Sequence, residues 1–167
     1  MMRRVNEFPD PLISGGFAPV VSLCKMDYPT VDGMRWMRAT VEETGDVYAQ
    51  YFLNESEGRL PAAGAYHLQA LCHAEQASGR LSIYIRNSDG DYSNVTYGEI
   101  SAGETKTCDL EFTIPSDSTE LVISLRPSNT VGASMMVSQI QLESKATYDA
   151  RGTGPTVFDG DMMPYDN

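Results

Sequence analysis

Two pairs of aspartates have a spacing that could bind a cation. Asp89 and Asp91 lie two residues apart in "NSDGD", and Asp159 and Asp161 lie two apart in "FDGD". Carboxylates at this spacing on a tight turn resemble part of a DxDG calcium loop, but neither pair has the downstream bidentate acid or the flanking helices of an EF-hand. We therefore interpret 87–91 as a hairpin turn and keep both pairs as candidate calcium ligands. No other cofactor is predicted.

Exposed aromatic side chains are the second group that could do chemistry, because sugars stack on exposed rings. The alternation around Trp36 turns its ring outward, and Tyr84, Tyr92 and Tyr97 lie on or beside the strands that border the "NSDGD" turn. Together they would form a glycan-binding platform. The preferred alternative for Trp36 is that it packs under an arm of the chain or against a partner chain.

Catalytic motifs are not found. The sequence has no GxSxG elbow, P-loop or GxGxxG, and no Ser-His-Asp set can be argued from it. Its two histidines, His67 and His73, are six residues apart on one strand, about 20 Å at ~3.3 Å per residue, so one metal cannot bridge them. We expect two surface histidines and predict that the protein is not an enzyme.

The net charge and the cysteines limit the binding partners and the cellular compartment that we expect. The net charge of −11 opposes binding to nucleic acid and to anionic lipid, and no segment reaches the ~20 apolar residues of a membrane span. The odd set Cys24, Cys72 and Cys108 contains no CxxC, which predicts buried free thiols rather than zinc or a disulfide framework. These features predict a protein made in the cytoplasm that stays soluble, with no nucleic acid or membrane partner.

β-Strands, whose side chains alternate between two faces, must position all of these residues. Apolar and polar residues alternate cleanly in four segments and less cleanly in five others, with Gly, Asn and Asp turns between them. The predicted strands are 65–75, 80–87, 105–115 and 120–127, then 20–26, 34–43, 47–53, 92–100 and 133–142.

This pattern predicts an all-β protein, a single antiparallel β-sandwich (jelly roll) of about nine strands. The sandwich would occupy 20–143, with an extended N-terminal arm at 1–19 and an irregular C-terminal arm at 144–167. No amphipathic helix of ten or more residues is predicted, and 73–79 could hold at most a short helical turn.

The order of segments resembles the carbohydrate-binding-module-like jelly-roll domains of bacteriophage structural proteins, namely minor tail or decoration proteins. The segments that carry the resemblance are "VNEFPDPLISGGF", "AAGAYHLQALCHAE", "RLSIYIRNSDGDY", "SAGETKTCDLEFTIPSDS", "TELVISLRPS" and "QLE" followed by "FDGD". Related modules often hold a structural calcium through acids near the first and last strands. Here "LISGGF" and "MMVSQIQ" have no acid at those places.

The resemblance implies a bacteriophage virion protein that is synthesised in the host cytoplasm and binds neighbouring virion proteins and copies of itself through its arms. The alternative is a glycan-binding adhesion module that recognises host cell-surface carbohydrate. Apolar residues of the arms would dock on the protein's own sandwich or on a neighbour. These anchors are Phe8, Phe17, Phe158, Met162, Met163 and Tyr165.

Overall fold

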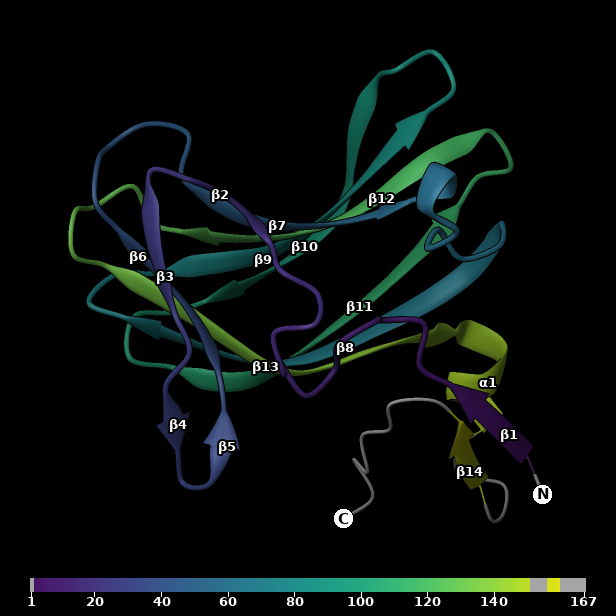
Figure 1. Ribbon diagram of the computed structural model, residues 1–167, viewed down its shortest axis with the longest axis horizontal. Helices are drawn as coiled ribbons and strands as arrows, with labels where there is room; N and C mark the ends of the chain where they lie inside the picture. Colours follow the sequence, from purple (N-terminus) through teal and green to yellow (C-terminus); the bar gives the residue numbers. More distant parts are fainter. Residues whose placement is uncertain (1, 151–155, 160–167) are drawn as a thin grey trace.

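Two five-stranded antiparallel sheets face each other and form a β-sandwich (Figure 1). This computed structural model describes residues 2–150 and 156–159, with backbone alone for 2–4 and 156–159. Sheet 1 has the order β10 (Tyr92–Ile100), β9 (Gly79–Asn87), β12 (Ser118–Pro127), β7 (Tyr48–Asn54) and β2 (Val20–Ser22). Sheet 2 has the order β11 (Thr105–Ile114), β8 (Gly64–Glu75), β13 (Ser134–Ser144), β6 (Met37–Val41) and β3 (Cys24–Asp27). The predicted all-β antiparallel jelly-roll sandwich is confirmed.

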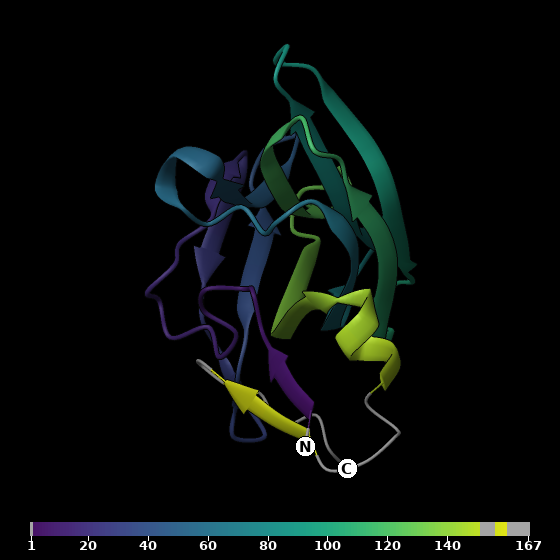
Figure 2. The same cartoon turned by 90° about the vertical axis from the view of Figure 1, so that its right-hand side faces the viewer.

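Smaller elements lie outside these two sheets. They are the hairpin β4 (Thr30–Val31) with β5 (Met34–Arg35), the parallel pair β1 (Met2–Val5) with β14 (Thr156–Asp159), the 3₁₀ turn η1 (Glu55–Glu57) and the helix α1 (Lys145–Asp149). Figure 2 shows β1 and β14 side by side below the sandwich, so the two arms meet. Residues 73–79, which could have held at most a short helical turn, contain none, because β8 continues to Glu75 and bends follow it.

Two predicted strands are broken by changes of backbone direction. Leu23 has φ +54°, a left-handed conformation that ends strand pairing and is uncommon for a branched side chain. The chain therefore leaves sheet 1 after β2 and enters sheet 2 with β3. The predicted strand 34–43 divides at Trp36 into β5, which belongs to the small hairpin, and β6, which belongs to sheet 2.

The core lies between the sheets and is built from the alternation seen in the sequence. β11 alternates buried and exposed residues from Cys108 to Ile114, and its neighbour β8 buries Leu68, Ala70 and Cys72 completely. Each fully buried Leu or Ile side chain stabilises the fold by ~1.5–3 kcal/mol. The fully covered apolar residues of sheet 1 are Ala49, Leu53, Leu81, Ile83, Ile100, Leu121, Ile123 and Leu125.

The N-terminal segment contributes to this core. Phe8 and Phe17 are only 2% and 8% exposed, and their ring centroids lie 5.0 and 5.3 Å from that of Tyr51 on β7. Both phenylalanines were expected to be docking anchors of an arm. The structure places them inside the protein's own sandwich, where they are covered and where edge-to-face packing adds to their burial.

Asn6 fastens the same segment to the last long strand. Its side-chain oxygen accepts a hydrogen bond from the Leu142 backbone N–H at 2.9 Å, and its amide nitrogen donates to the Ile140 carbonyl at 3.0 Å. The Glu7 N–H donates to the Leu142 carbonyl at 2.7 Å. The opening Asn and the closing "QLE" are therefore in direct contact, although they are more than 130 residues apart.

Candidate functional site

The outer face of sheet 1 gathers five aromatic rings, which we call the tyrosine platform: Tyr48, Phe52, Tyr84, Tyr92 and Tyr97. They come from β7, β9 and β10. Tyr48, Phe52 and Tyr84 alternate with buried residues of β7 and β9, and the register of β10 places Tyr92 and Tyr97 beside outer-face residues of β9. Tyr92 and Tyr97 are 51% and 52% exposed, which is unusual for large rings and marks a surface for contact.

Strand pairing brings these side chains together from distant parts of the chain. Three rows of outer-face residues cross the sheet: Tyr92, Arg86, Glu120 and Asn54; then Asn94, Tyr84, Val122 and Phe52; then Tyr97, Ser82, Ser124 and Gln50. Each row places an aromatic ring beside polar side chains. In the third row the small residues Ser82 and Ser124 are fully covered by larger neighbours, so the surface is lower there.

A β-bulge puts both exposed tyrosines of β10 on one face. Tyr92 and Tyr97 are five residues apart, an odd spacing that would place them on opposite faces of a regular strand. The register shifts between Asn94 and Thr96, so that Tyr92 pairs with Arg86 and Tyr97 pairs with Ser82, both outer-face residues of β9. The bulge therefore assembles the platform at this edge.

Polar groups hold the rings in place. The Tyr92 hydroxyl donates to Glu120 at 2.5 Å, and burial together with this hydrogen bond raises the pKa of Tyr92 above its usual value. The Arg126 guanidinium pairs with Asp46 and lies 5.9 Å from the ring centroids of both Tyr48 and Tyr84, within cation–π distance.

A hollow of about 360 Å³ opens on this face. Its lining residues are Asp46, Tyr48, Gln50, Phe52, Tyr84, Tyr92, Val122 and Arg126. The hollow therefore offers ring faces next to a carboxylate, a side-chain amide and a guanidinium. This is the combination that a sugar requires, because its C–H faces stack on aromatic rings while its hydroxyls accept and donate hydrogen bonds.

The predicted aromatic residues divide into two groups. Tyr84, Tyr92 and Tyr97 are on the platform, and Trp36 is not. Trp36 precedes β6 of sheet 2 and is 6% exposed, so its predicted exposure is wrong. The alternative, that it packs under an arm of the chain or against a partner chain, stays a prediction. A covered ring cannot stack on a sugar without rearrangement.

The platform also contains residues that sequence reasoning missed. Tyr48 and Phe52 alternate with the core residues of β7, and this alternation could have predicted that both rings face outward. Their partners were not visible, because β7 pairs with β12 about 70 residues later and brings Arg126 and Glu120 onto the face.

The first aspartate pair belongs to no cluster of metal-binding side chains among the described residues, and the second pair is only partly described. Asp89 and Asp91 lie in the turn between β9 and β10, where the Asp91 N–H donates to the Asn87 side chain at 2.9 Å. Within residues 2–150 and 156–159, no three His, Cys, Asp or Glu side chains gather at metal-binding distances. Asp159 belongs to β14, and Asp161 lies outside the described residues.

The remaining arm residues are only partly described. Phe158 belongs to β14, and its backbone is in register with that of Arg4 on β1. Met162, Met163 and Tyr165 lie outside the described residues, so their docking stays a prediction.

The two histidines differ in exposure. Both face away from the core on β8, as predicted, but His67 is only 3% exposed. The Tyr148 ring of α1 stacks on it with a centroid distance of 3.3 Å, and Glu143 is its cross-strand neighbour on β13. The prediction of two surface histidines is therefore wrong for His67, because α1 covers this part of sheet 2.

The three cysteines are free and buried, as predicted. The Cys72 thiol on β8 donates to the Ala70 carbonyl at 3.8 Å, and its interaction with Cys108 on β11 together with burial raises its pKa. None of the helices in the described part of the chain has the length and hydrophobicity needed to cross a membrane.

Several solved structures of carbohydrate-binding modules resemble this sandwich. The CBM22-2 xylan-binding domain of Paenibacillus barcinonensis Xyn10C has 10% sequence identity and a TM-score of 0.60 over 84% of this chain and 98% of that one. The CBM22-1–GH10 modules of Clostridium thermocellum Xyn10B, complexed with xylohexaose, give 13% identity and a TM-score of 0.62, covering 84% of this chain and 27% of that one. A family 29 module gives 15% identity and a TM-score of 0.55, covering 84% and 89%.

These similarities show the fold. No protein-family model matches the sequence, and no curated protein matches it. The part of the expectation that concerned a carbohydrate-binding-module-like jelly roll is therefore confirmed, and none of these three structures points to a bacteriophage origin.

Proposed function

We propose that this protein is a non-catalytic carbohydrate-binding module and that the tyrosine platform binds the glycan. The single observation that carries the proposal is the set of five rings on one sheet face, interleaved with hydrogen-bonding side chains. This arrangement suits a polysaccharide chain, which is long, amphipathic and able to lie flat on a sheet.

The dimensions of the face support a chain rather than a single sugar. The outer-face positions of β12 run from Glu120 to Arg126, a span of about 20 Å at ~3.3 Å per residue. The printed names of the similar domains include xylan binding and a xylohexaose complex, which makes β-linked polysaccharides the first class to test.

Affinity electrophoresis against a panel of soluble plant and bacterial cell-wall polysaccharides tests the proposal. We expect retarded migration in at least one gel. Tyr97→Ala should weaken that binding by about two- to tenfold, because one stacking contact contributes ~0.5–1.5 kcal/mol. Tyr97→Phe keeps the ring and should bind like the wild type. No retardation by any polysaccharide, or equal binding by Tyr97→Ala, would contradict the proposal.

A virion structural role is a second candidate, and it is compatible with glycan binding. The order of the motifs from Asn6 to "QLE" and "FDGD" favours it, as does the pairing of β1 with β14, which joins both arms into one potential docking element. In this role the arms would contact neighbouring virion proteins and further copies of this chain, and the platform would face host surface glycan.

Mass spectrometry of purified particles tests this second role. We expect the chain to be present in stoichiometric amounts in the particles of a phage that encodes it. Its absence from such particles would eliminate the virion role and leave the carbohydrate-binding proposal unaffected.

A further inference from the structure

Two arginines lie side by side at one end of the tyrosine platform. Arg80 on β9 and Arg126 on β12 are direct cross-strand partners on the outer face of sheet 1. Like charges placed directly opposite on neighbouring strands repel each other and lower stability. Such a pair indicates a ligand of opposite charge, unless the protein itself neutralises both guanidinium groups.

The protein neutralises only one of them within the described part of the chain. Arg126 pairs with Asp46, whose side chain is 69% exposed and therefore free to rotate away. Arg80 has no carboxylate within 4.0 Å among the described residues, and its charged group lies 5.6 Å from the ring centroid of Tyr97. Glu99 is its register partner on β10 but does not form an ion pair with it.

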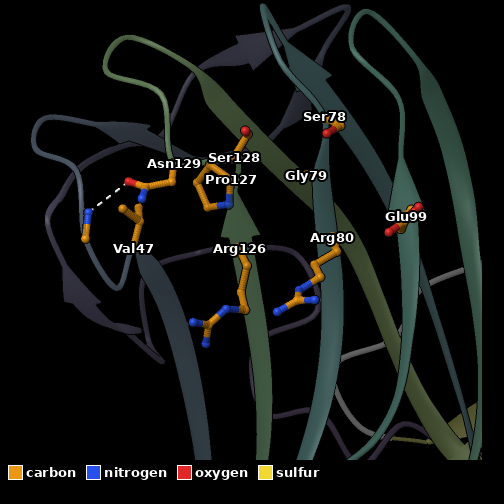
Figure 3. A pocket seen from close by; sticks show the side chains of 10 residues that line it. Val47, Ser78, Gly79, Arg80, Glu99, Arg126, Pro127, Ser128 and Asn129 are labelled. Carbon is orange, nitrogen blue, oxygen red and sulfur yellow. Dashed lines mark hydrogen bonds between the residues drawn. The ribbon is translucent and has the colours of Figure 1, made fainter.

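Figure 3 shows how these side chains are directed. The Arg80 side chain extends toward Arg126 and away from Glu99, so that two guanidinium groups occupy the same side of a hollow. This hollow has a volume of about 270 Å³, and its lining contains Arg80, Arg126 and a single carboxylate, Glu99. Ser78, Ser128 and Asn129 add hydroxyl and amide groups.

Asn129 is oriented for donation. Its side-chain oxygen accepts a hydrogen bond from the Gly45 N–H at 2.8 Å, which leaves the two amide hydrogens as donors on the other side of the group. The polar groups at this end are thus mostly donors, whereas the 360 Å³ hollow is dominated by rings.

We propose that Arg80 and Arg126 form an anion subsite that binds the carboxylate or phosphate substituents of an acidic polysaccharide. The inference rests on the proposed carbohydrate-binding function and specifies its ligand class. Arg126 lines both hollows, so a chain stacked on the rings of one hollow passes the guanidinium groups of the other. Planar guanidinium groups bind carboxylate and phosphate through two parallel hydrogen bonds, which gives geometric selectivity.

Overall charge cannot produce this selectivity. The net charge of −11 repels any polyanion at long range, so a preference for an acidic polymer must come from a local site. Local ion pairs between partly exposed groups weaken with added salt, and the preference should decline accordingly.

The test compares one polysaccharide in two chemical forms. Isothermal titration calorimetry measures the affinity for a uronate-bearing polysaccharide and for the same polymer after its carboxyls are reduced to alcohols. A third arm uses a neutral backbone that carries phosphate substituents. We expect at least tenfold tighter binding to one anionic form than to the neutral polymer, equivalent to ~1.4 kcal/mol.

Two variants test whether the preference for acidic polysaccharide depends on Arg80. Arg80→Gln should reduce the ratio of acidic to neutral affinity to nearly one, whereas Lys25→Gln should leave the ratio unchanged, because Lys25 is an exposed residue of β3 in sheet 2. A circular dichroism melt checks that both variants fold.

The outcomes separate the two proposals. A preference for uronate alone or phosphate alone supports the subsite and identifies its ligand. Equal affinity for all forms, or a preference that survives in Arg80→Gln, overturns the subsite and leaves glycan binding intact. Failure of every form to bind overturns both proposals.

Discussion

Replacing Asp10 should destabilise the protein without affecting the tyrosine platform. The Asp10 residue is 6% exposed, and its carboxylate accepts four hydrogen bonds from the loop that follows it. Oδ1 accepts from the Ser14 N–H at 2.8 Å and the Ser14 hydroxyl at 2.7 Å, and Oδ2 accepts from Gly15 at 2.9 Å and Phe17 at 3.4 Å. The loop holds Phe17 against Tyr51 in the core.

The expected cost follows from these contacts. A hydrogen bond to a charged group contributes a net ~1.5–3 kcal/mol, but the four bonds are not additive and the freed N–H groups of the exposed loop can bind water. Asp10→Ala should therefore lower the free energy of unfolding by about 2–4 kcal/mol. For a domain of this size, each kcal/mol lowers Tm by ~2–4 °C, so the shift is on the order of 10 °C.

The pH dependence gives an independent check. Burial acts to raise the pKa of Asp10, but its four hydrogen bonds hold that pKa below the usual value. A depressed pKa contributes stability that is present above the unfolded value of ~3.9 and is lost as pH falls through the folded value. The difference between wild type and Asp10→Ala should thus be largest near neutral pH and shrink below about pH 4.

Urea unfolding at several pH values measures both effects. Asp117→Ala, which removes an exposed acid in the turn before β12, serves as the matched control and should change stability by less than ~0.5 kcal/mol. A loss below ~1 kcal/mol for Asp10→Ala, or a loss that does not depend on pH, would refute the reasoning.

Three further predictions concern the core and its surroundings. Gly98→Ala should lower the free energy of unfolding in urea by ~1–3 kcal/mol, because the new methyl would lie 2.7 Å from the Cys108 sulfur. Adding Cys108→Ala to the same chain should recover part of that loss. Full stability of the Gly98→Ala variant would contradict this prediction. Trp36→Phe should change the free energy of unfolding by less than ~1 kcal/mol, because the lost ring volume is offset by removal of a buried indole N–H that has no hydrogen-bond partner among the described residues. A loss above ~2 kcal/mol would contradict this prediction. Iodoacetamide should modify Cys24, Cys72 and Cys108 only after denaturation, because all three thiols are buried. Mass spectrometry measures this, and a modified cysteine in briefly treated native protein would contradict it.

Period-two alternation was sufficient to predict most of the fold. The segment Thr105–Ile114 alternates without interruption, and the structure makes it a strand with one buried face. Hydrophobic burial acts on every second side chain of a strand, so this information is local and survives in a single sequence. Breaks caused by single backbone angles are not visible in this way, which is why the change of sheet at Leu23 was missed.

Burial of outer-face residues was the main source of error. His67 and Trp36 both have the alternation of solvent-facing residues, yet both are covered. For His67 the cover is Tyr148, which lies 81 positions later in a helix of five residues. Such cover depends on tertiary packing of a short element that has no periodic signal of its own.

The tyrosine platform was predicted only in part for a related reason. Tyr84 could be placed by alternation, but Tyr92 and Tyr97 share a face only because of the bulge in β10. Arg126 joins them through pairing of β12 with β9, and strand order in a sandwich is a non-local property. The aromatic residues were therefore identifiable as candidates, whereas their common surface was not.

Residue-resolved NMR during titration with a soluble glycan that binds tests the central claim most directly. Xylo-oligosaccharides are the first probe, followed by the polysaccharides retained in the affinity gels. The account predicts that the largest shifts in backbone amide resonances fall on β7, β9, β10 and β12, around Tyr84, Tyr92 and Tyr97. Shifts concentrated on sheet 2, or spread evenly with no maximum on sheet 1, would contradict it.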